Sequence, residues 1–300
     1  MTSSWKRRCR QRAQAPPRTC VSTLLGIGLI SIILTGCVEP TPPEGSDPKL
    51  DAAPEQSAGP KDPALVEQDE AKIGHAFRQL GAGDLGGCRV TAMEVLANDP
   101  APATRDRAEF MIGLSFHKAK QYADARPHFD LASQGPNFQG KLALPYFQGW
   151  CYFWLGELDA AEASFRQHLT QAEEGDSYFG LGIVALDRGD NAAAKSALQK
   201  ALQLFEAKAA TGDASAKRDL AKTHARLADL DLDSEDFEGA KIHLQLAVDL
   251  DSDRSAVWYK LYQVYLELGE DGPASSALAE YKRCLDSGQS TGGMAAGGGR

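Results

Sequence analysis

A small residue recurs along this chain at the interval of one helical hairpin, and this recurrence limits the fold more than any other feature. The spacings between successive positions are 37, 36, 33, 46 and 34 residues. After most of these positions comes a Gly-Asp or Gly-Glu turn, with alanine four or five residues further on. Because a small residue lets a second helix approach closely, each interval predicts two packed helices. The recurring positions are Ala76, Gly113, Gly149, Gly182, Ala228 and, with a larger side chain, Tyr262.

One copy shows the pattern in full. Residues 108–116 read Ala-Glu-Phe-Met-Ile-Gly-Leu-Ser-Phe, and Gln121-Tyr122, Ala125, Phe129 and Ala132 follow. This order resembles the tetratricopeptide repeat, a helix–turn–helix unit of about 34 residues. The resemblance covers residues 66–287. It implies an all-α solenoid of about six antiparallel helix pairs, in which the first helices line a concave surface that holds peptides or partner helices.

The longest interval, 46 residues, contains about 12 residues more than a normal unit. The additional residues lie near positions 205–219, and alanine-rich sequence flanks Thr211-Gly212-Asp213. This composition predicts two lengthened helices joined by a turn, and not a separate domain.

The N-terminal segment has the anatomy of an export signal. A stretch with six basic residues and no acid precedes an apolar run over residues 21–34. The next residues complete Leu34-Thr35-Gly36-Cys37, which resembles the lipobox of bacterial lipoproteins. The resemblance implies a signal peptide over residues 1–36 and a lipid on Cys37. The alternative is an uncleaved membrane helix over residues 20–38, which lacks charge but is short for a membrane span.

Segments without core-forming residues flank the repeats. Residues 37–65 contain many prolines together with acidic and small residues, and they predict a disordered linker. Residues 288–300 are rich in glycine and predict a disordered tail.

The charge of the chain restricts its partners. The full sequence has 32 basic and 41 acidic residues, a net charge of −9. Removal of residues 1–36 takes six bases and no acid, which leaves 26 bases against 41 acids, a net charge of −15. Binding to nucleic acid needs basic patches, so nucleic acid is not an expected partner. Neutral or basic proteins are better matched to this charge.

Motifs for catalysis or for a cofactor are not found in the sequence. The six histidines have no metal-ligand spacing. The acidic run at residues 229–233 lacks the glycine and the bidentate glutamate of a calcium loop. Cys88, Cys151 and Cys284 are expected to be buried apolar residues, with one disulfide as the alternative. The sequence therefore predicts neither an enzyme nor a metal or cofactor site.

Aromatic residues concentrate in the second complete copy and share a broad helical face. We expect this face to line a peptide-binding groove, with aromatic side chains as anchors. The alternative is that these side chains pack against neighbouring repeats or are covered by the linker. The groove residues are predicted to be Phe110, Met111, Leu114, Tyr146, Phe147, Trp150, Phe153, Trp154, Phe179 and Ile183.

These features together predict a lipid-anchored adaptor of the bacterial cell envelope that binds protein partners through the repeats. The layout resembles that of repeat-bearing lipoproteins that help to assemble outer-membrane barrels or pilus secretins. By analogy, Val38 after Cys37 fits sorting to an outer membrane, with the repeats facing the periplasm. Two alternatives stay open: a protein that binds peptidoglycan or another glycan, and a scaffold held by an uncleaved N-terminal helix.

Overall fold

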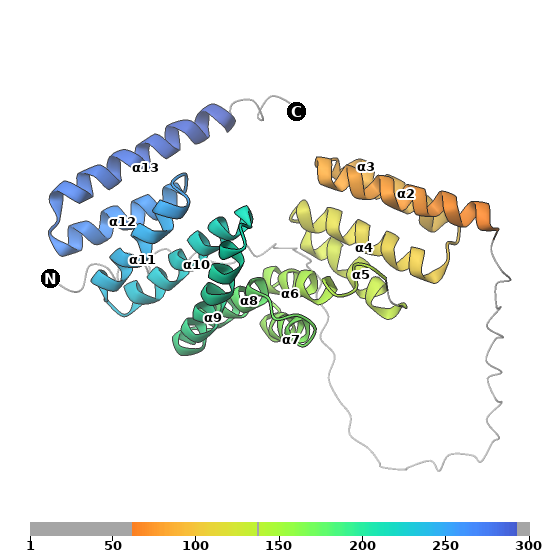
Figure 1. The fold of residues 1–300 in the computed structure, drawn as a ribbon, viewed down its shortest axis with the longest axis horizontal. Coiled ribbons are helices and arrows are strands. Elements are labelled where there is room, and N and C mark those ends of the chain that lie inside the picture. The colour runs from red at the N-terminus through yellow and green to blue at the C-terminus, as the bar shows by residue number, and fades with distance from the viewer. Residues whose placement is uncertain (1–61, 137, 293–300) are drawn as a thin grey trace, which may run out of the picture. The chain divides into compact units, whose positions relative to one another are not determined.

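The computed structural model of this chain describes residues 62–136 and 138–292. The described residues form twelve α-helices and no strand (Figure 1). The helices follow one another in pairs: α2 (Pro63–Ala82) and α3 (Leu85–Ala97); α4 (Pro102–Lys118) and α5 (Tyr122–Gln134); α6 (Leu144–Trp154) and α7 (Leu158–Leu169); α8 (Gly175–Asp187) and α9 (Asn191–Ala210); α10 (Ala214–Asp233) and α11 (Phe237–Leu250); α12 (Ser255–Leu268) and α13 (Asp271–Gly292). The predicted all-α class is confirmed.

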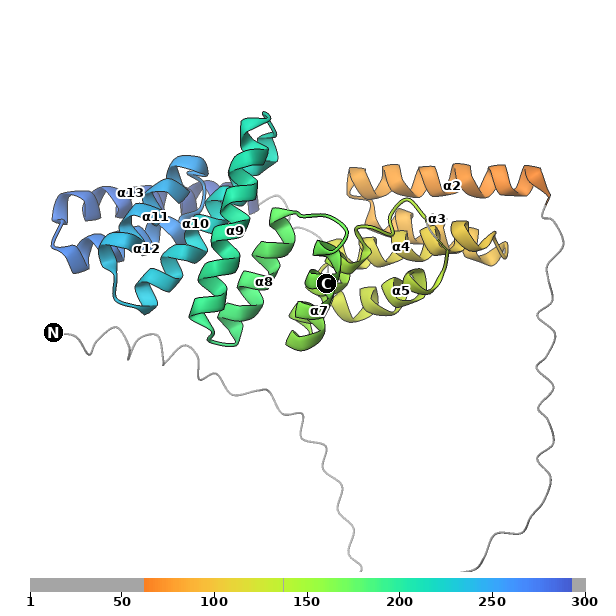
Figure 2. The ribbon, with the colours of Figure 1, turned by 60° about the horizontal axis from the view of Figure 1, so that its bottom comes forward.

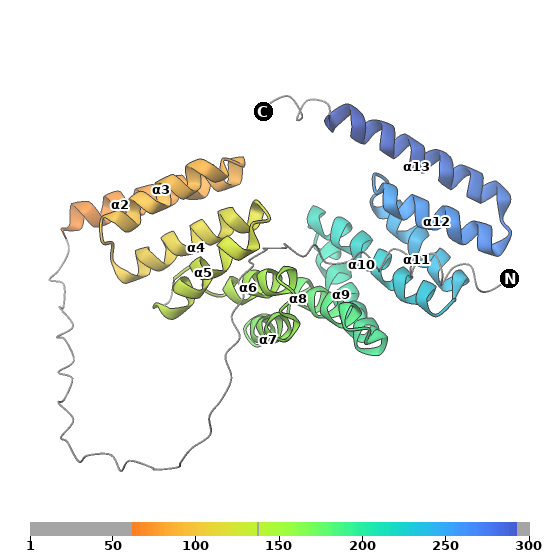
Figure 3. The same ribbon diagram turned by 180° about the vertical axis from the view of Figure 1, so that it is seen from behind.

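Each helix packs against its partner in the pair and against the helix that follows in the chain. The first helices also contact one another across pairs, α2 with α4, α4 with α6, and α6 with α8. The same succession of pairs is visible from behind (Figure 3). The described residues thus form an α-solenoid, in which a continuous core runs between neighbouring pairs.

Glycines at the recurring positions lie directly against a large side chain of the second helix of the pair. A Cβ atom on Gly113 would lie 2.6 Å from the ring of Phe129, and one on Gly182 would lie 2.7 Å from Cγ of Leu198. Phe129 and Leu198 are both fully buried. The absence of a side chain at these positions therefore makes room for a large residue of the second helix.

The turns between paired helices combine a left-handed residue with a side-chain cap on the next helix. Gly189 has a φ of 75°, the left-handed conformation that ends a helix without steric cost. The side chain of Asp190 then accepts a hydrogen bond from the backbone N–H of Ala193 and caps α9. Where the pattern lacks glycine, as at Glu235, another residue adopts the left-handed conformation with a φ of 62°.

The helical part of the chain extends beyond the predicted repeat boundaries at both ends. Asp62 Oδ1 accepts a hydrogen bond from the N–H of Ala64, and Pro63 occupies the first turn, where its missing N–H has no cost. Helix α2 therefore begins within the segment that the sequence predicts to be linker. Helix α13 continues to Gly292, within the predicted tail. Cys37 and the predicted signal peptide lie outside the described residues.

The lengthened helices predicted for the 46-residue interval are present. Helices α9 and α10 each contain 20 residues and are joined at Thr211, Gly212 and Asp213. Figure 2 shows the ends that meet at this turn projecting past the neighbouring helices. The additional residues thus lengthen two repeat helices and add no separate domain.

The three cysteines in the described part of the chain are free and buried, as expected. None of the helices that the structure describes has both the length and the apolar character needed to cross a membrane.

Candidate partner-binding face

The first helices of consecutive pairs carry equivalent residues at the same positions of the repeat. In each first helix, these are the residues three positions before, one position after and five positions after the recurring small residue. Residues spaced by four along a helix lie on the same face, so these three positions form a continuous row. We call the row formed by α2, α4, α6, α8, α10 and α12 the first-helix stripe. Its members are Ile73, Phe77 and Gly81; Phe110, Leu114 and Lys118; Tyr146, Trp150 and Trp154; Phe179, Ile183 and Asp187; Ala225, Asp229 and Asp233; Tyr259, Gln263 and Glu267.

An apolar pocket of about 480 Å³ opens on the stripe between α2 and α4. Phe77 is 65% exposed at its edge. Gly74 adds to the opening, because a Cβ atom there would meet only Nη1 of Arg78 at 3.6 Å. The pocket is lined by Glu70, Ile73, Gly74, Phe77, Arg107, Phe110, Met111, Leu114, Phe138, Gln139 and Gly140.

An ion pair borders this apolar pocket. The guanidinium of Arg107 forms an ion pair with the carboxylate of Glu70, and the hydroxyl of Thr104 donates to Glu70 Oε1 over 2.8 Å. The pair connects α4 with α2 and fixes both charged side chains at the side of the pocket. The rest of the lining offers mainly apolar surface, which suits an aliphatic or aromatic side chain.

Helix α6 supplies the aromatic section of the stripe. Trp150 packs edge-on against Phe165, with ring centroids 5.3 Å apart, and its ring is 6.4 Å from that of Phe179 on α8. Tyr146 lies beside the same Phe165 ring at 6.3 Å. These contacts hold the aromatic rings in fixed positions, while Tyr146 and Trp150 stay partly exposed.

Trp154 is the last residue of α6 in the first-helix stripe, and it is more exposed than Tyr146 and Trp150. Its side chain is 57% exposed and stacks on Tyr122 of α5, with the ring planes 10° apart and the centroids 5.7 Å apart. One face of the indole is therefore supported and the other is open to a partner.

The structure distributes the predicted groove residues between pocket, core and surface. Phe110 and Met111 are buried in the core, although both also line the pocket between α2 and α4. Leu114 lines the same pocket and is partly exposed. The remaining partly exposed residues pack against buried core residues or lie beside them; they are Tyr146, Phe147, Trp150, Phe153, Phe179 and Ile183.

The sequence reasoning missed the contribution of α2 to this face. Ile73 and Phe77 occupy the same register as Phe110 and Leu114, so the repeat spacing alone was a sufficient signal for both. Phe138 could not be found in this way. It belongs to the connection between α5 and α6, and its ring reaches Phe110 with centroids 5.5 Å apart.

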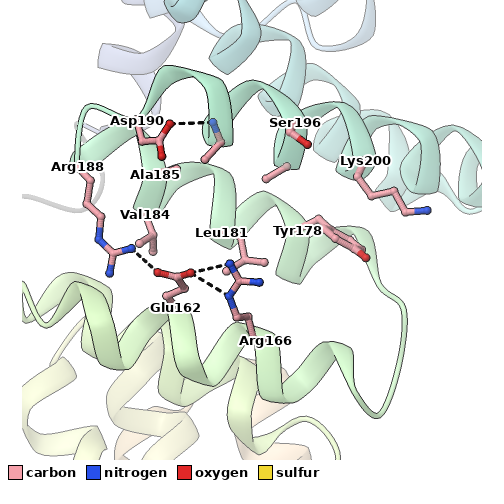
Figure 4. A pocket seen from close by; sticks show the side chains of 12 residues that line it. Glu162, Arg166, Tyr178, Leu181, Val184, Ala185, Arg188, Asp190, Ser196 and Lys200 are labelled. Atoms are coloured by element: carbon pink, nitrogen blue, oxygen red, sulfur yellow. Dashed lines mark hydrogen bonds and ion pairs between the residues drawn. The ribbon is translucent and has the colours of Figure 1, made fainter.

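A second depression, of about 510 Å³, lies between α7 and the pair α8–α9 (Figure 4). At its floor, the Glu162 carboxylate is held by both Arg166 and Arg188, which point toward it from opposite sides. These two arginines lower the pKa of Glu162. Glu162, Arg166 and Arg188 are thus engaged with one another and connect α7 to the end of α8.

Two cysteines and one tyrosine of the described chain have raised pKa values because of burial. Burial raises the pKa of Cys88 to about 11 and that of Cys151 to about 12, so both remain neutral thiols at pH 7. Burial and nearby carboxylates raise the pKa of Tyr146 to about 12. Within the described residues, no group of three or more His, Cys, Asp or Glu side chains is placed to hold a metal ion.

Comparison with known proteins identifies the type of repeat. Residues 175–208, which contain α8 and most of α9, match the family model of the tetratricopeptide repeat. The fold is a tetratricopeptide-repeat solenoid. No curated protein matches the sequence of this chain.

Several solved structures share the fold. The APC/C hetero-tetramer Cut9–Hcn1 matches with 18% identity and a TM-score of 0.58, over 74% of this chain and 42% of that chain. The present chain thus spans less than half of that protein's length. The pilF protein of Pseudomonas aeruginosa matches with 16% identity and a TM-score of 0.57, over 73% of this chain and 93% of that one. NprR, in complex with its cognate peptide NprX, matches with 14% identity and a TM-score of 0.53, over 74% and 68% of the two chains.

Proposed function

We propose that this chain is a non-enzymatic scaffold that binds a partner protein or peptide on its first-helix stripe. We further propose that a lipid on Cys37 ties it to a membrane of a bacterial envelope. The observation that carries the binding function is the apolar pocket between α2 and α4, with Phe77 65% exposed at its edge. An apolar pocket with few polar groups in its lining is a common binding site for the side chain of a ligand or partner.

The arrangement of anchors supports this proposal. Phe77, Leu114 and Trp150 occupy one register position on three consecutive first helices. A bound segment would meet a similar apolar contact at each helix, and contacts of this kind provide most of the affinity in protein interfaces. The peptide complex of NprR, which has the same fold, is consistent with this mode of binding.

Site-specific photocrosslinking in cells tests the binding function. A photoreactive amino acid at Phe77 should form adducts with a defined partner. The same amino acid at Ile242, which is 55% exposed on the second helix α11, should not. If both positions give the same adducts, or neither does, binding at the stripe is excluded.

A filled pocket provides the second arm of this experiment. In Gly74→Leu, the added side chain has free space and enters the pocket, so adducts from Phe77 should be lost. Gly74→Ala is the matched control, because it changes the helix in the same place without filling the pocket. Retention of the adducts in Gly74→Leu would contradict the proposed site.

The membrane anchor rests on the sequence Leu34-Thr35-Gly36-Cys37. Fractionation of cells that express Cys37→Ala should find the protein released from membranes, because the thiol that would carry the lipid is absent. The intact mass of the membrane-bound form decides between the alternatives. A mass that begins at Met1 would reveal an uncleaved helix and contradict lipidation.

A further inference from the structure

The first-helix stripe changes chemistry from its N-terminal to its C-terminal repeats. The last position of the stripe, five residues after the recurring small residue, is acidic in three consecutive first helices: Asp187 in α8, Asp233 in α10 and Glu267 in α12. The equivalent residues of α2, α4 and α6 are Gly81, Lys118 and Trp154. Acidic residues at this position are thus confined to the second half of the array.

These carboxylates occupy unfavourable positions in their own helices. Asp187 and Asp233 are the last residues of α8 and α10, and Glu267 is the last but one of α12. The helix dipole disfavours negative charge at a C-terminus. All three side chains are exposed, and none forms a hydrogen bond or ion pair with the described part of the chain. These carboxylates are therefore available to a partner.

Two cations beside the C-terminal half of the stripe are already engaged. Arg226 and Lys260 both pair with Asp229, one turn before Asp233. Burial, and after it Asp229, raises the pKa of Asp233, and Lys260 lowers this pKa by less. On α8 there is no basic residue at all, and α6 carries no charge of either sign. The C-terminal half of the stripe is therefore left with unbalanced negative charge.

The N-terminal half of the same stripe is apolar. Its anchors are Phe77, Leu114 and Trp150, and the pocket between α2 and α4 opens there. Lys118, the one cation at the last position of the stripe, donates to the carbonyl of Leu80 over 3.1 Å. A single bound segment that follows the stripe would thus meet apolar side chains first and carboxylates afterwards.

We infer that the partner segment of this stripe is bipartite, with aromatic or aliphatic residues at the end that contacts α2, α4 and α6, and lysine or arginine at the end that contacts α8, α10 and α12. This inference rests on the proposed binding function and specifies its ligand. Charge complementarity selects a basic segment over an acidic one, because a like charge opposite these carboxylates would be repelled. Each contact at an exposed carboxylate contributes modestly, and three together favour a basic segment by about tenfold in affinity.

Selection of a random peptide library displayed on phage, with the purified full chain as bait, tests this inference. The native chain should enrich peptides that combine an apolar end with a basic end. The triple variant Asp187→Asn, Asp233→Asn, Glu267→Gln should lose the enrichment of lysine and arginine and keep that of apolar residues. A synthetic peptide from the native selection should bind this variant about tenfold more weakly at low salt, and high salt should reduce the difference.

A matched control uses the second helices of the same three pairs. Glu206 in α9, Asp249 in α11 and Asp286 in α13 are also exposed and form no hydrogen bond or ion pair with the described residues. The triple variant Glu206→Gln, Asp249→Asn, Asp286→Asn removes the same net charge, and it should leave the selected peptides basic. If both triple variants have the same effect, overall charge and not the stripe selects the peptides, and the inference is wrong.

Two further outcomes separate this inference from the proposed function. Enrichment of neutral or acidic apolar peptides that fail to bind Gly74→Leu would overturn the bipartite ligand and keep the binding site. Absence of any enriched peptide, or peptides that bind Gly74→Leu unchanged, would overturn the proposed function together with the inference.

Discussion

Two glycines within first helices show that the effect of an added Cβ atom on stability depends on the neighbouring side chains. A Cβ atom on Gly149 would lie 2.7 Å from the ring of buried Phe165, whereas one on Gly74 meets nothing closer than 3.6 Å. Gly149→Ala should therefore lower the free energy of unfolding by about 1–2 kcal/mol, because overpacking outweighs the gain in helix propensity. Gly74→Ala should raise it by about 0.5–1 kcal/mol. Urea denaturation measures both, and equal effects of the two substitutions would contradict this account of the small residues.

A pair of histidines gives the array a pH-dependent contact. Nδ1 of His224 on α10 lies 3.0 Å from Nδ1 of His243 on α11, and His224 is 7% exposed. Burial and the neighbouring His243 lower the pKa of His224 from its ordinary 6.5 to about 4. Burial also lowers the pKa of His243, although Asp231 raises it. Both rings are thus neutral in the folded chain at a pH where they are protonated in the unfolded chain.

The stability should therefore fall as the pH decreases from about 6.5 to about 4, because the unfolded state binds the proton first. The shift of His224 corresponds to about 3 kcal/mol over this range. Carboxylates with a raised pKa, such as Asp106 and Asp176, act in the opposite direction. The variant His224→Gln retains these carboxylates. Subtracting its free energy of unfolding from that of the native chain at each pH therefore cancels most of their contribution. The difference in unfolding free energy between native chain and variant should decrease toward pH 4, and a constant difference would show that His224 does not titrate.

At the scale of the helix, the Gly-Asp turn sets where the second helix of a pair begins. Asp190 caps α9 through the N–H of Ala193 at 3.0 Å, whereas Glu174, before α8, forms no such hydrogen bond with its side chain. Asp190→Ala should lower the free energy of unfolding by about 1 kcal/mol, and Asp190→Asn should change it little. Glu174→Ala is the control and should have a small effect. A large loss in the control would show that the cap is not the cause.

The limits of prediction from sequence are clearest in these same elements. The spacing of small residues was sufficient for the helix pairs, and the 46-residue interval was sufficient for lengthened α9 and α10. Only part of the pocket lining could be predicted from the sequence. Phe138 reaches the pocket from the connection between α5 and α6, which does not follow the repeat spacing. The contact between His224 and His243 was not predictable either, because it depends on how α11 is rotated against α10.

At the scale of the whole described array, stability should vary along the chain. Helix α6 packs against α4, α5, α7 and α8, whereas the packing of α13 is chiefly on α12. In a linear array each pair is stabilised by its neighbours, so a terminal helix opens at a lower free energy than an internal one. The buried apolar residues of α13 are the small residues Ala274, Ala277 and Cys284, and its Leu285 is 40% exposed.

Hydrogen exchange followed by mass spectrometry should therefore show α13 exchanging fastest among the described helices and α6 to α9 slowest. Tyr281 is one of the residues that hold α13 in place, since its ring lies 5.2 Å from that of Tyr259 on α12. Tyr281→Ala should speed exchange in α13 and α12 and leave α4 to α7 unchanged, because stabilisation passes between neighbours only. If the variant instead speeds exchange equally in every helix, the array opens as one cooperative unit, and the neighbour-to-neighbour description of its stability is wrong.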